Sequence, residues 1–408
     1  MTRPFDGCRV TLGVTGGIAC YKTVTLARLL TQAGAVVDVI LSRAAREFVG
    51  AITFEAVTGR PVAPGILEPG HALSHIRLAR ESSLVMIAPA TADLLARAAQ
   101  GRADDQLTAV LLATRAPVLM APAMNDGMWS HKLTLGNVQI LRDLGYEVLE
   151  PDTGPLAFGE GVGPGRMPEP EVLLAHAGRL LETARGLANH HLVVTAGPTR
   201  EAIDPVRYLT NHSTGRMGVA IAAAAWRRGA RVTLIHGPLE VPLPVGAACV
   251  AVMSTAQMRD AVAAALPTAD ALIMAAAPAD FRSARVEAHK IKKGDASLVI
   301  ELEQTEDILA STRVHRKPGA IMMGFALETS DLEAHAMAKM RRKGLDFIVA
   351  NDALEAGAGF GTDTNRVTIL SATGQPETIP LMLKTDLADV LLDRVWRALD
   401  ARATESHA

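Results

Sequence analysis

The sequence has few cysteines, few aromatic residues and no excess of charge of either sign. Three cysteines, Cys8, Cys20 and Cys249, are too few and too widely spaced for a disulfide framework or a thiolate metal site. The net charge of -2 gives the molecule no overall field that would attract nucleic acid or an acidic membrane surface. Any recognition of phosphate must therefore be local.

Long apolar runs are also missing. No stretch approaches the ~20 apolar residues that cross a bilayer, and the N-terminus has neither the charged start nor the cleavage region of a signal peptide. These absences predict a cytoplasmic protein that binds neither membrane nor nucleic acid. Aromatic residues make up 3% of the chain and hydrophobic residues 49%, which is typical of helices packed tightly on parallel sheets.

The length and the periodicity together predict two domains. A chain of 408 residues exceeds what a single core usually supports, and short apolar runs alternate with helical patterns in both halves. Strands are predicted at residues 9–14, 36–41, 84–88, 117–121 and 147–149, and again at residues 191–195, 232–235, 271–275, 321–325 and 347–349.

The second series of strands starts afresh after residues 184–190, so we place the boundary between domains 1–187 and 188–408. Both domains are predicted to be doubly wound, three-layer α/β folds of the Rossmann type. The first is expected to be flavodoxin-like, and the second to have a mainly parallel sheet with a nucleotide-binding loop.

The most informative segment is the polar loop between Val193 and Gly218. A loop rich in Thr, Asn, Ser, Arg and Gly between two apolar segments predicts contact with a ligand. Its end, from Ser213 to Gly218, leads into a helical run through Trp226. Free amides at a helix start, small residues and a nearby Arg216 are the usual features of a phosphate site. The alternative is an ordinary capped helix.

In the first half, Gly16 and Gly17 close a predicted strand and open a helix, which by itself is a weak sign of a nucleotide site. Ser42, Thr91 and Asn125 follow three other predicted strands. The carboxyl ends of parallel strands meet at one edge of a sheet, so this recurrence indicates a flat ligand with polar edges. Each residue alone is equally compatible with a turn or a helix cap.

The motifs carry a resemblance to known families at both ends of the chain. The first half resembles the flavin-dependent cysteine decarboxylases in VTGGIACYK, HALSHIRLAR, PATADLLARAAQGRADD, PAMNDGMW and GVGPGRMPEP. The second half resembles the phosphopantothenate-cysteine ligases in AGPTREAIDPVRYLTNHSTGRMG, AAPADF, KIKK and GFALET. In this order they resemble the bacterial bifunctional family of coenzyme A biosynthesis that joins phosphopantothenoylcysteine decarboxylase to the ligase.

For the second half, the resemblance implies that 4'-phosphopantothenate is joined to cysteine through an acyl-cytidylate made from CTP, with Mg²⁺. It implies that Asn211 handles the acyl-cytidylate, that Lys290 takes part in catalysis, and that Arg207 binds the substrate's phosphate or carboxylate. The residues implied to contact CTP are Asp280, Lys290, Glu306, Asp307, Ile308, Leu309, Phe325, Lys339 and Lys343.

The spacing of the lysines supports an anion site. Lys290 and Lys292 lie two apart in a strand-like run and are predicted to share a face, and Lys339 and Lys343 lie one helical turn apart. A solvated helix face is the alternative for the second pair.

For the first half, the resemblance implies an FMN cofactor that oxidises the cysteine thiol, so that CO₂ can leave, and then reduces the product to 4'-phosphopantetheine. It implies that His75 accepts a proton and that Asn125 orients the substrate. Gly16, Gly17, Ser42 and Thr91 would hold FMN. It also implies a homo-oligomer, with trimeric decarboxylase and dimeric ligase contacts that complete both sites.

One departure from the family pattern concerns the final proton. Phe158 stands in Leu-Ala-Phe-Gly-Glu where the family usually has a cysteine that protonates the enethiolate. Glu160, His71, His131 or a water could deliver this proton. Alternatively, the domain stops at the enethiol, or it only binds flavin as a regulatory module.

A nicotinamide oxidoreductase is a further alternative, since two Rossmann-like halves and a glycine turn would suit it. Asp38 argues against it, because this acid lies inside its predicted strand rather than after it, where a ribose-binding acid belongs.

Overall fold

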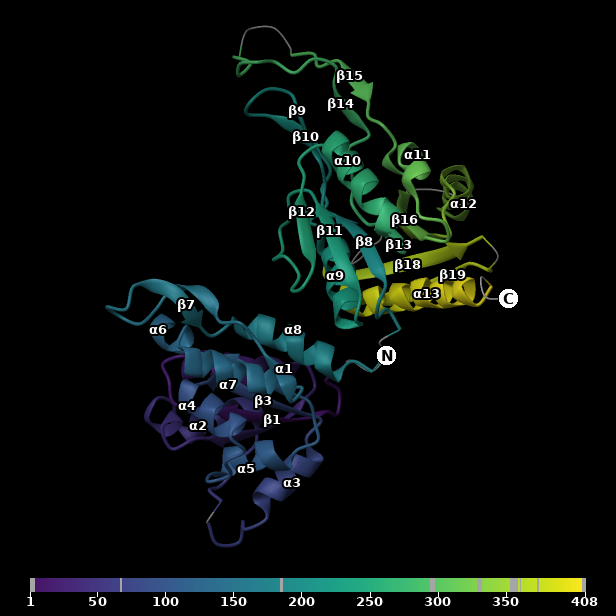
Figure 1. Cartoon of the computed structure of the whole chain (residues 1–408). Helices are drawn as coiled ribbons and strands as arrows, with labels where there is room; N and C mark the ends of the chain where they lie inside the picture. Colours follow the sequence, from purple (N-terminus) through teal and green to yellow (C-terminus); the bar gives the residue numbers. More distant parts are fainter. Residues whose placement is uncertain are drawn as a thin grey trace. The chain divides into compact units, whose positions relative to one another are not determined.

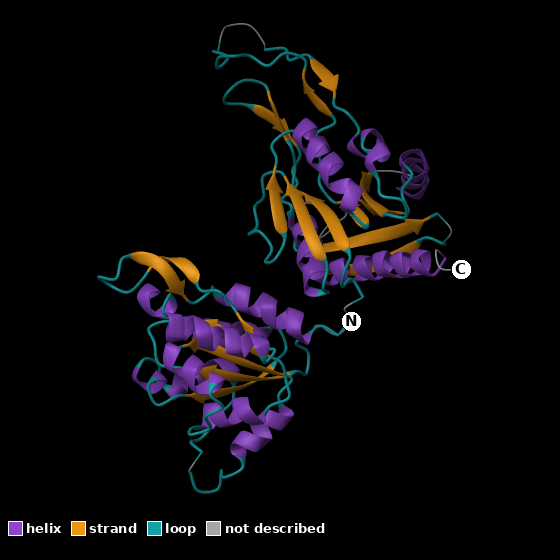
Figure 2. Ribbon diagram, viewed as in Figure 1, coloured by secondary structure: helices purple, strands orange, loops and turns teal. Residues whose placement is uncertain are grey.

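The structure is a computed structural model that describes residues 4–66, 68–183, 186–293, 298–328, 332–352, 359, 361–372 and 374–405. The chain divides into two units, Met1–Thr183 and Ala184–Ala408. The boundary predicted from the sequence lies between residues 187 and 188. Each unit is a sheet covered by helices on both faces (Figure 1, Figure 2).

The first unit contains a five-stranded parallel sheet in the order β2-β1-β3-β4-β5. This is the strand order of flavodoxin-like folds, as predicted. The strands are β1 (Arg9–Val14), β2 (Val36–Leu41), β3 (Leu84–Ala90), β4 (Val118–Pro122) and β5 (Glu147–Val148). The predicted strands are confirmed to within about two residues at their ends, the ordinary uncertainty of element boundaries.

Alternation along β3 explains the three layers of this unit. Leu84 and Met86 pack into one core, and Val85 and Ile87 pack into the other. The first core also takes side chains from α1 (Cys20–Gln32), α2 (Ala51–Thr58) and α8 (Pro170–Leu181). The second takes them from α3 (Ser74–Glu81), α4 (Ala92–Ala99), α5 (Gln106–Ala113) and α7 (Lys132–Asp143).

Three smaller features complete the first unit. These are η1 (Ala45–Glu47), α6 (Asp126–Trp129) and an antiparallel hairpin of β6 (Asp152–Pro155) and β7 (Val162–Arg166). The hairpin was not predicted, because its strands are short, rich in Gly and Pro and mostly exposed, so they carry no apolar alternation.

The second unit contains an eight-stranded sheet in the order β12-β11-β8-β13-β16-β17-β18-β19. The first six strands are parallel and the last two antiparallel, so the predicted mainly parallel sheet is confirmed. The strands are β8 (His191–Ala196), β11 (Arg231–His236), β12 (Ala248–Ala251), β13 (Ala271–Met274), β16 (Ile321–Glu328), β17 (Phe347–Asp352), β18 (Thr364–Ser371) and β19 (Glu377–Leu383).

Helices cover both faces of this sheet as well. Leu192 and Val194 of β8 face a core shared with α9 (Arg216–Arg227) and α13 (Lys384–Glu405). Val193 faces the other core, to which α10 (Thr255–Ala265), α11 (Ile308–Ser311) and α12 (Leu332–Lys343) contribute. Short 3-10 turns lie at η2 (Leu266–Thr268) and η3 (Arg313–His315). None of the helices in the described ranges is long and apolar enough to cross a bilayer.

Two short antiparallel ribbons extend beyond the large sheet, and we call them together the arm (Figure 1). They pair β9 (Arg200–Ala202) with β10 (Tyr208–Thr210), and β14 (Phe281–Ser283) with β15 (Leu302–Gln304). The amide of Glu287 donates to the carbonyl of Ile203 at 3.0 Å, which joins the two ribbons.

The prediction of a strand-like run around Lys290 and Lys292 is wrong. Both lysines lie in the irregular part of the arm between β14 and β15. The backbone of Ile291 between them bonds to side chains instead of a neighbouring strand: its amide donates to Asp204 Oδ2 at 3.1 Å, and its carbonyl accepts from Arg207 at 2.6 Å.

Gly218 allows α9 to approach β8 closely. A Cβ on Gly218 would lie 2.6 Å from the carbonyl oxygen of Thr195 and 2.5 Å from the Cβ of Ala196. We therefore expect Gly218→Ala to destabilise the second unit by about 1–3 kcal/mol through overpacking, measured as a lower urea midpoint of that unit's unfolding transition.

Gly136→Ala is the matched control, because Gly136 also lies inside a helix but a Cβ there meets nothing within 4 Å. It should stabilise α7 by roughly 1 kcal/mol through helix propensity alone. Equal effects of the two substitutions on their units would contradict the close-packing role of Gly218.

Candidate functional site

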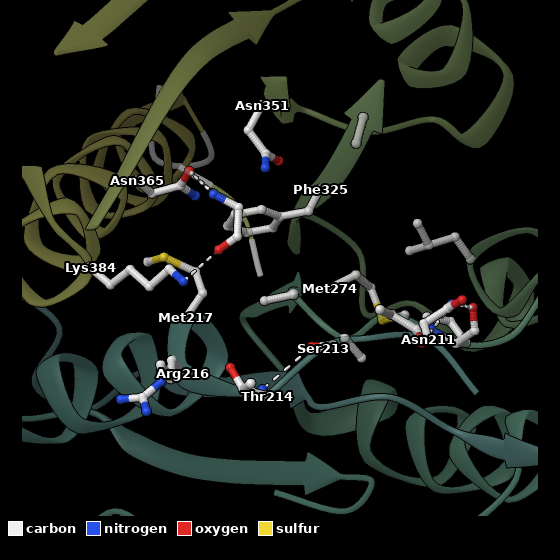
Figure 3. Close-up of a pocket in the computed structure, with 18 of the residues that line it drawn as sticks. Asn211, Ser213, Thr214, Arg216, Met217, Met274, Phe325, Asn351, Asn365 and Lys384 are labelled. Atoms are coloured by element: carbon white, nitrogen blue, oxygen red, sulfur yellow. Dashed lines mark hydrogen bonds between the residues drawn. The ribbon is translucent and has the colours of Figure 1, made fainter. Parts of the chain in front are cut away.

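The second unit contains a cavity of about 400 Å³ at the carboxyl ends of its parallel strands. We call it the second-unit cavity (Figure 3). Its wall combines the segment leading into α9, the segment after β13, and side chains from β16, β17, α12, β18 and α13. Among the described residues that line it, Asp280 is the single carboxylate, whereas Arg216, Lys339, Lys343 and Lys384 are cationic. The cavity therefore suits an anion.

Asn211 lies at one end of this cavity, as the sequence predicted (Figure 3). Its side-chain amide donates to the carbonyls of Ala277 at 3.2 Å and Pro278 at 3.1 Å. These bonds fix the side chain against the segment that follows β13. Its Oδ1 remains available to accept a hydrogen bond from a ligand.

The two predicted lysines of α12 lie together on the cavity wall. Lys339 Nζ donates to the carbonyl of Phe325 at 3.5 Å, and Lys343 Nζ forms an ion pair with Asp307 Oδ2 at 2.9 Å. Burial raises the pKa of Asp307, but the hydrogen bond and the charge of Lys343 outweigh this effect, so the pKa lies below its ordinary value. Asp307 also caps α11 by accepting from the amide of Ala310.

A smaller cavity of about 130 Å³ shares Asp280, Leu309 and Lys343 with the first. It is lined in addition by Glu306, Asp307 and Ile308, three more residues of the predicted CTP set. Glu306 forms an ion pair with Arg259. The structure thus brings Asn211, Phe325 and most of the predicted CTP residues to one connected region.

Lys290 and Arg207 do not line either cavity within one chain. Lys290 is exposed on the arm. The guanidinium of Arg207 is engaged with Asp204 at 2.6 Å and the carbonyl of Ile291 at 2.6 Å, so it holds the two ribbons of the arm together. Their roles toward substrate remain predictions.

Three polar side chains of the lining were missed by the sequence reasoning, namely Asn351, Asn365 and Lys384. Asn351 is the next-to-last residue of β17, a parallel strand, so the strand-end argument used for Ser42 and Thr91 would have found it. Asn365 and Lys384 come from the antiparallel extension and from the last helix, for which the sequence carries no comparable signal.

The first unit contains its own cavity of about 560 Å³, the first-unit cavity, at the carboxyl edge of the five-stranded sheet. It is lined by Gly16, Gly17, Thr91 and Asn125, four of the residues predicted from the sequence. The hairpin of β6 and β7 contributes Leu156, Glu160 and Arg166 to its wall.

The glycine turn of this cavity has the geometry of a phosphate cradle. A Cβ on Gly16 would lie 2.4 Å from that of Ala44, whereas Gly17 faces open space. Within the described residues, no hydrogen bond occupies the backbone amides of Gly16, Gly17 and Ile18. Thr15 Oγ1 accepts from the amide of Thr91 at 3.1 Å and ties this turn to the end of β3.

The two cationic side chains that line this cavity, Lys22 and Arg166, are both paired with Glu169. Lys22 is 8% exposed, and its Nζ donates to the carbonyl of Met167 at 2.9 Å and to Glu169 Oε1 at 2.7 Å. Arg166 also donates to Glu169, at 3.3 Å. Glu160 is the one lining carboxylate among the described residues, and its side chain has no protein partner there.

His75 and Ser42 do not line the first-unit cavity. His75 lies near the start of α3, and its Nδ1 is buried without a hydrogen-bond partner within the described residues. Ser42 Oγ accepts from the amide of Ala45 at 3.1 Å, so it serves as a local cap at the end of β2. One chain therefore does not bring His75 and Asn125 together.

The other candidates for the final proton lie elsewhere in the first unit. His71 lines a separate cavity with Asp38 and Arg60. His131 caps α7, where its Nδ1 accepts from the amide of Leu133 at 3.2 Å. Phe158 is fully exposed at the tip of the hairpin.

Two protein-family profiles match the chain. The profile described as Flavoprotein matches residues 2–207, and the one described as DNA/pantothenate metabolism flavoprotein C-terminal domain matches residues 187–399.

Curated proteins match along nearly the whole length. The coenzyme A biosynthesis bifunctional protein CoaBC of Vibrio cholerae is 44% identical over 390 residues, which cover 95% of this chain and 97% of that protein. The protein of the same name from Mycobacterium tuberculosis is 46% identical over 402 residues, covering 95% of this chain and 96% of that protein. The crystal structure of the C-terminal domain of a CoaBC protein is 37% identical, covering 53% of this chain and 99% of that chain, with a TM-score of 0.46.

The Lys343–Asp307 pair generates a prediction about titration. In Lys343→Met, the pKa of Asp307 should rise, because burial then acts without the opposing charge. Carboxyl-carbon NMR titration would measure this shift, with Asp93, which is largely exposed and pairs with Arg97, as the internal reference.

The sign of the effect on stability follows from linkage. The folded pKa of Asp307 is lowered, so its contribution is present above the unfolded pKa of about 3.9 and is lost as the pH falls through the folded pKa. Lys343→Met should therefore weaken the acid dependence of the second unit's stability. An unchanged Asp307 titration would contradict the pair.

Proposed function

The chain belongs to the family of coenzyme A biosynthesis bifunctional proteins, and on that premise we propose which unit performs each of its two activities, a ligation and a decarboxylation. The ligase is assigned to residues 188–408 and the decarboxylase to residues 1–187. The observation that carries the assignment is the contrast between the two cavities. The second-unit cavity is lined by four cationic side chains and one carboxylate, whereas the first-unit cavity has a glycine turn with free amides.

In the ligase unit, CTP activates the carboxylate of 4'-phosphopantothenate, and the amine of cysteine then displaces CMP. A carboxylate is a poor electrophile, so nucleotidyl transfer supplies the leaving group, and pyrophosphate is released. Asn211, held by two carbonyls, presents its Oδ1 to the acyl-cytidylate. CTP is bound by the residues of the predicted set that line the second-unit cavity and the smaller cavity joined to it, namely Asp280, Phe325, Lys339, Lys343 and residues 306–309.

Mg²⁺ would be held jointly by the triphosphate and Asp280. Within the described residues, no group of three or more histidine, cysteine or carboxylate side chains forms a metal cluster. A metal that arrives with the nucleotide needs only one or two protein carboxylates, and Asp280 borders both connected cavities.

In the decarboxylase unit, the first-unit cavity fits FMN. The free amides of Gly16 and Gly17 would receive the phosphate, and the apolar side chains of Met124 and Leu156 would contact the ring system. When bound, FMN supplies the two-electron chemistry that makes the loss of CO₂ possible and returns the product to the thiol level. The chain's own task is to orient the carboxylate with Asn125 and to move protons.

In this proposal, Glu160 protonates the enethiolate, the step for which the family usually has a cysteine at the position of Phe158. It lines the cavity, and it has no partner among the described residues, whereas His71 and His131 lie elsewhere. The alternative of a flavin unit without turnover is not favoured, because relatives that match 95% of the chain are bifunctional proteins by name.

A second copy of the chain completes both sites. His75 lies outside the first-unit cavity, and Lys290 and Arg207 lie outside the second-unit cavity. We propose trimeric contacts for the decarboxylase unit and dimeric contacts for the ligase unit, so that residues of one copy reach the cavity of another.

Asn211→Ala and Lys290→Ala should each reduce CTP-dependent release of pyrophosphate by about 10²-fold or more, the loss typical when a group that stabilises a transition state is removed. Both variants should retain the flavin absorbance, since the flavin site belongs to the other unit. Arg285→Ala is the matched control for Lys290, because it removes another exposed cation of the same arm. Loss of flavin in either variant would contradict the assignment of the units.

His75→Ala should lower CO₂ release by about 10²–10⁴-fold, the range for a removed acid-base group, and Asn125→Ala should also impair it. Co-expression of the two variants tests whether sites are shared between copies. In random trimers, about one quarter of the sites would combine an intact Asn125 with a neighbour's intact His75. If the mixture recovers about one quarter of the unsubstituted activity, the sites are shared between copies. If it recovers none, His75 does not act in the cavity of a neighbouring copy.

A further inference from the structure

Arg316 joins the ends of two helices that carry residues of the predicted CTP set. It follows η3 and lines neither the second-unit cavity nor the smaller cavity joined to it. Its Nη2 donates to the carbonyls of Leu309 in α11 and Lys343 in α12, each at 3.1 Å. Its Nη1 donates to the carbonyl of Gly344 at 2.9 Å. The side chain thus contacts the backbone of the CTP set without lining the cavities.

The end of α12 leaves its last carbonyls free for this arginine. The amide of Leu345 donates to the carbonyl of Met340 at 3.0 Å, and Gly344 is left-handed with φ 59°. This is the Schellman pattern, in which the chain turns away at the end of a helix. The carbonyls of Lys343 and Gly344 then have no partner within the helix, and both accept from Arg316.

The charge of Arg316 also suits this place. Burial lowers the pKa of Arg316, the nearby charge of Arg313 lowers it further, and Asp346 acts against both. The guanidinium stays protonated, because the ordinary pKa of arginine lies far above neutral pH. Carbonyls at the end of a helix carry partial negative charge, and a cation beside them offsets it. Arg316 therefore reduces the negative potential next to a cavity that we assign to an anion.

Two contacts join α11 to α12. One is the ion pair of Lys343 with Asp307, the residue that caps α11. The other is Arg316, which binds the carbonyls of Leu309 and Lys343 together. A lysine side chain is flexible, whereas a planar guanidinium bound to carbonyls of two helices holds their backbones at a fixed separation. The position of the Lys343 ammonium group therefore depends on Arg316.

We propose that Arg316 is a positioning residue of the ligase site, which ties the end of α12 to α11 and so holds Lys343 toward CTP without touching the nucleotide itself. The inference rests on the proposed ligase function and extends it to a residue outside the predicted CTP set. Because the effect passes through a binding residue, it should appear in the KM for CTP more than in kcat.

The test is calorimetric binding of CTP to the full-length protein. Arg316→Met should weaken binding about tenfold, the order of one lost hydrogen bond to a charged group. Arg316→Lys should weaken it as well, because an ammonium group lacks the planar fork. Arg402→Met is the matched control, since Arg402 also donates to two carbonyls of this unit, those of Gly319 at 3.0 Å and Ala320 at 2.9 Å. Neither belongs to the CTP set, so this control should bind CTP normally.

Two further measurements separate positioning from a general loss of stability. In Arg316→Met, the pKa of Asp307 should rise in a carboxyl-carbon NMR titration without nucleotide, because Lys343 is no longer held beside it. In the Lys343→Met background, Arg316→Met should cost less than a further twofold in CTP affinity, because the side chain that it positions is absent.

The proposal is overturned if both Arg316 variants bind CTP within twofold of the unsubstituted protein, or if Arg402→Met weakens binding as much as they do. It is also overturned if the titration of Asp307 is unchanged, or if the losses from Arg316→Met and Lys343→Met multiply in the double variant. Failure of the ligase assignment is a different result, namely no CTP binding by the unsubstituted protein, and the inference would fall with it.

Discussion

The structure depends on the alignment of strand ends and helix starts at one edge of each parallel sheet. Because all the parallel strands run the same way, each turn at their carboxyl ends delivers small residues and free amides to the same edge. Thr15 ties the glycine turn of the first unit to the end of β3 by accepting from the amide of Thr91. In the second unit, Asn211 is tied in the same manner to the carbonyls that follow β13.

The charged side chains near the two cavities are held by nearby partners, and the net charge of the molecule contributes little to binding. With a net charge of -2, the protein has no general attraction for polyanions. The cations that line the second-unit cavity are each held by a carboxylate or a carbonyl, as Lys343 is by Asp307 and Lys384 by Gly359. A cation held in this way keeps its position when a ligand leaves, so little ordering is needed when the next one binds.

The two units differ in what surrounds this common edge. In the first unit, a short exposed hairpin lies over the cavity and brings Glu160 to it. In the second, the sheet continues into two antiparallel strands and a final helix, which close the far end of the cavity with Asn365 and Lys384. The same strand-end geometry therefore underlies both the cavity that we propose for flavin in the first unit and the cation-lined cavity of the second.

The sequence by itself determined the parallel strands, the order of the two units and the residues that local rules place at strand ends. Gly16, Thr91 and Asn125 were found in this way, because short-range periodicity and turn chemistry depend on consecutive residues, whereas Asn211 was implied by the family resemblance of its loop. The hairpin, the antiparallel strands and the cavity residues Asn365 and Lys384 were not found, since exposed Gly-Pro strands and edge strands carry weak periodicity. Only the tertiary structure decided that Lys384 meets Arg216 across 168 positions of sequence, and that Lys290 lies on an irregular arm, because such contacts arise from packing between elements that share no local pattern.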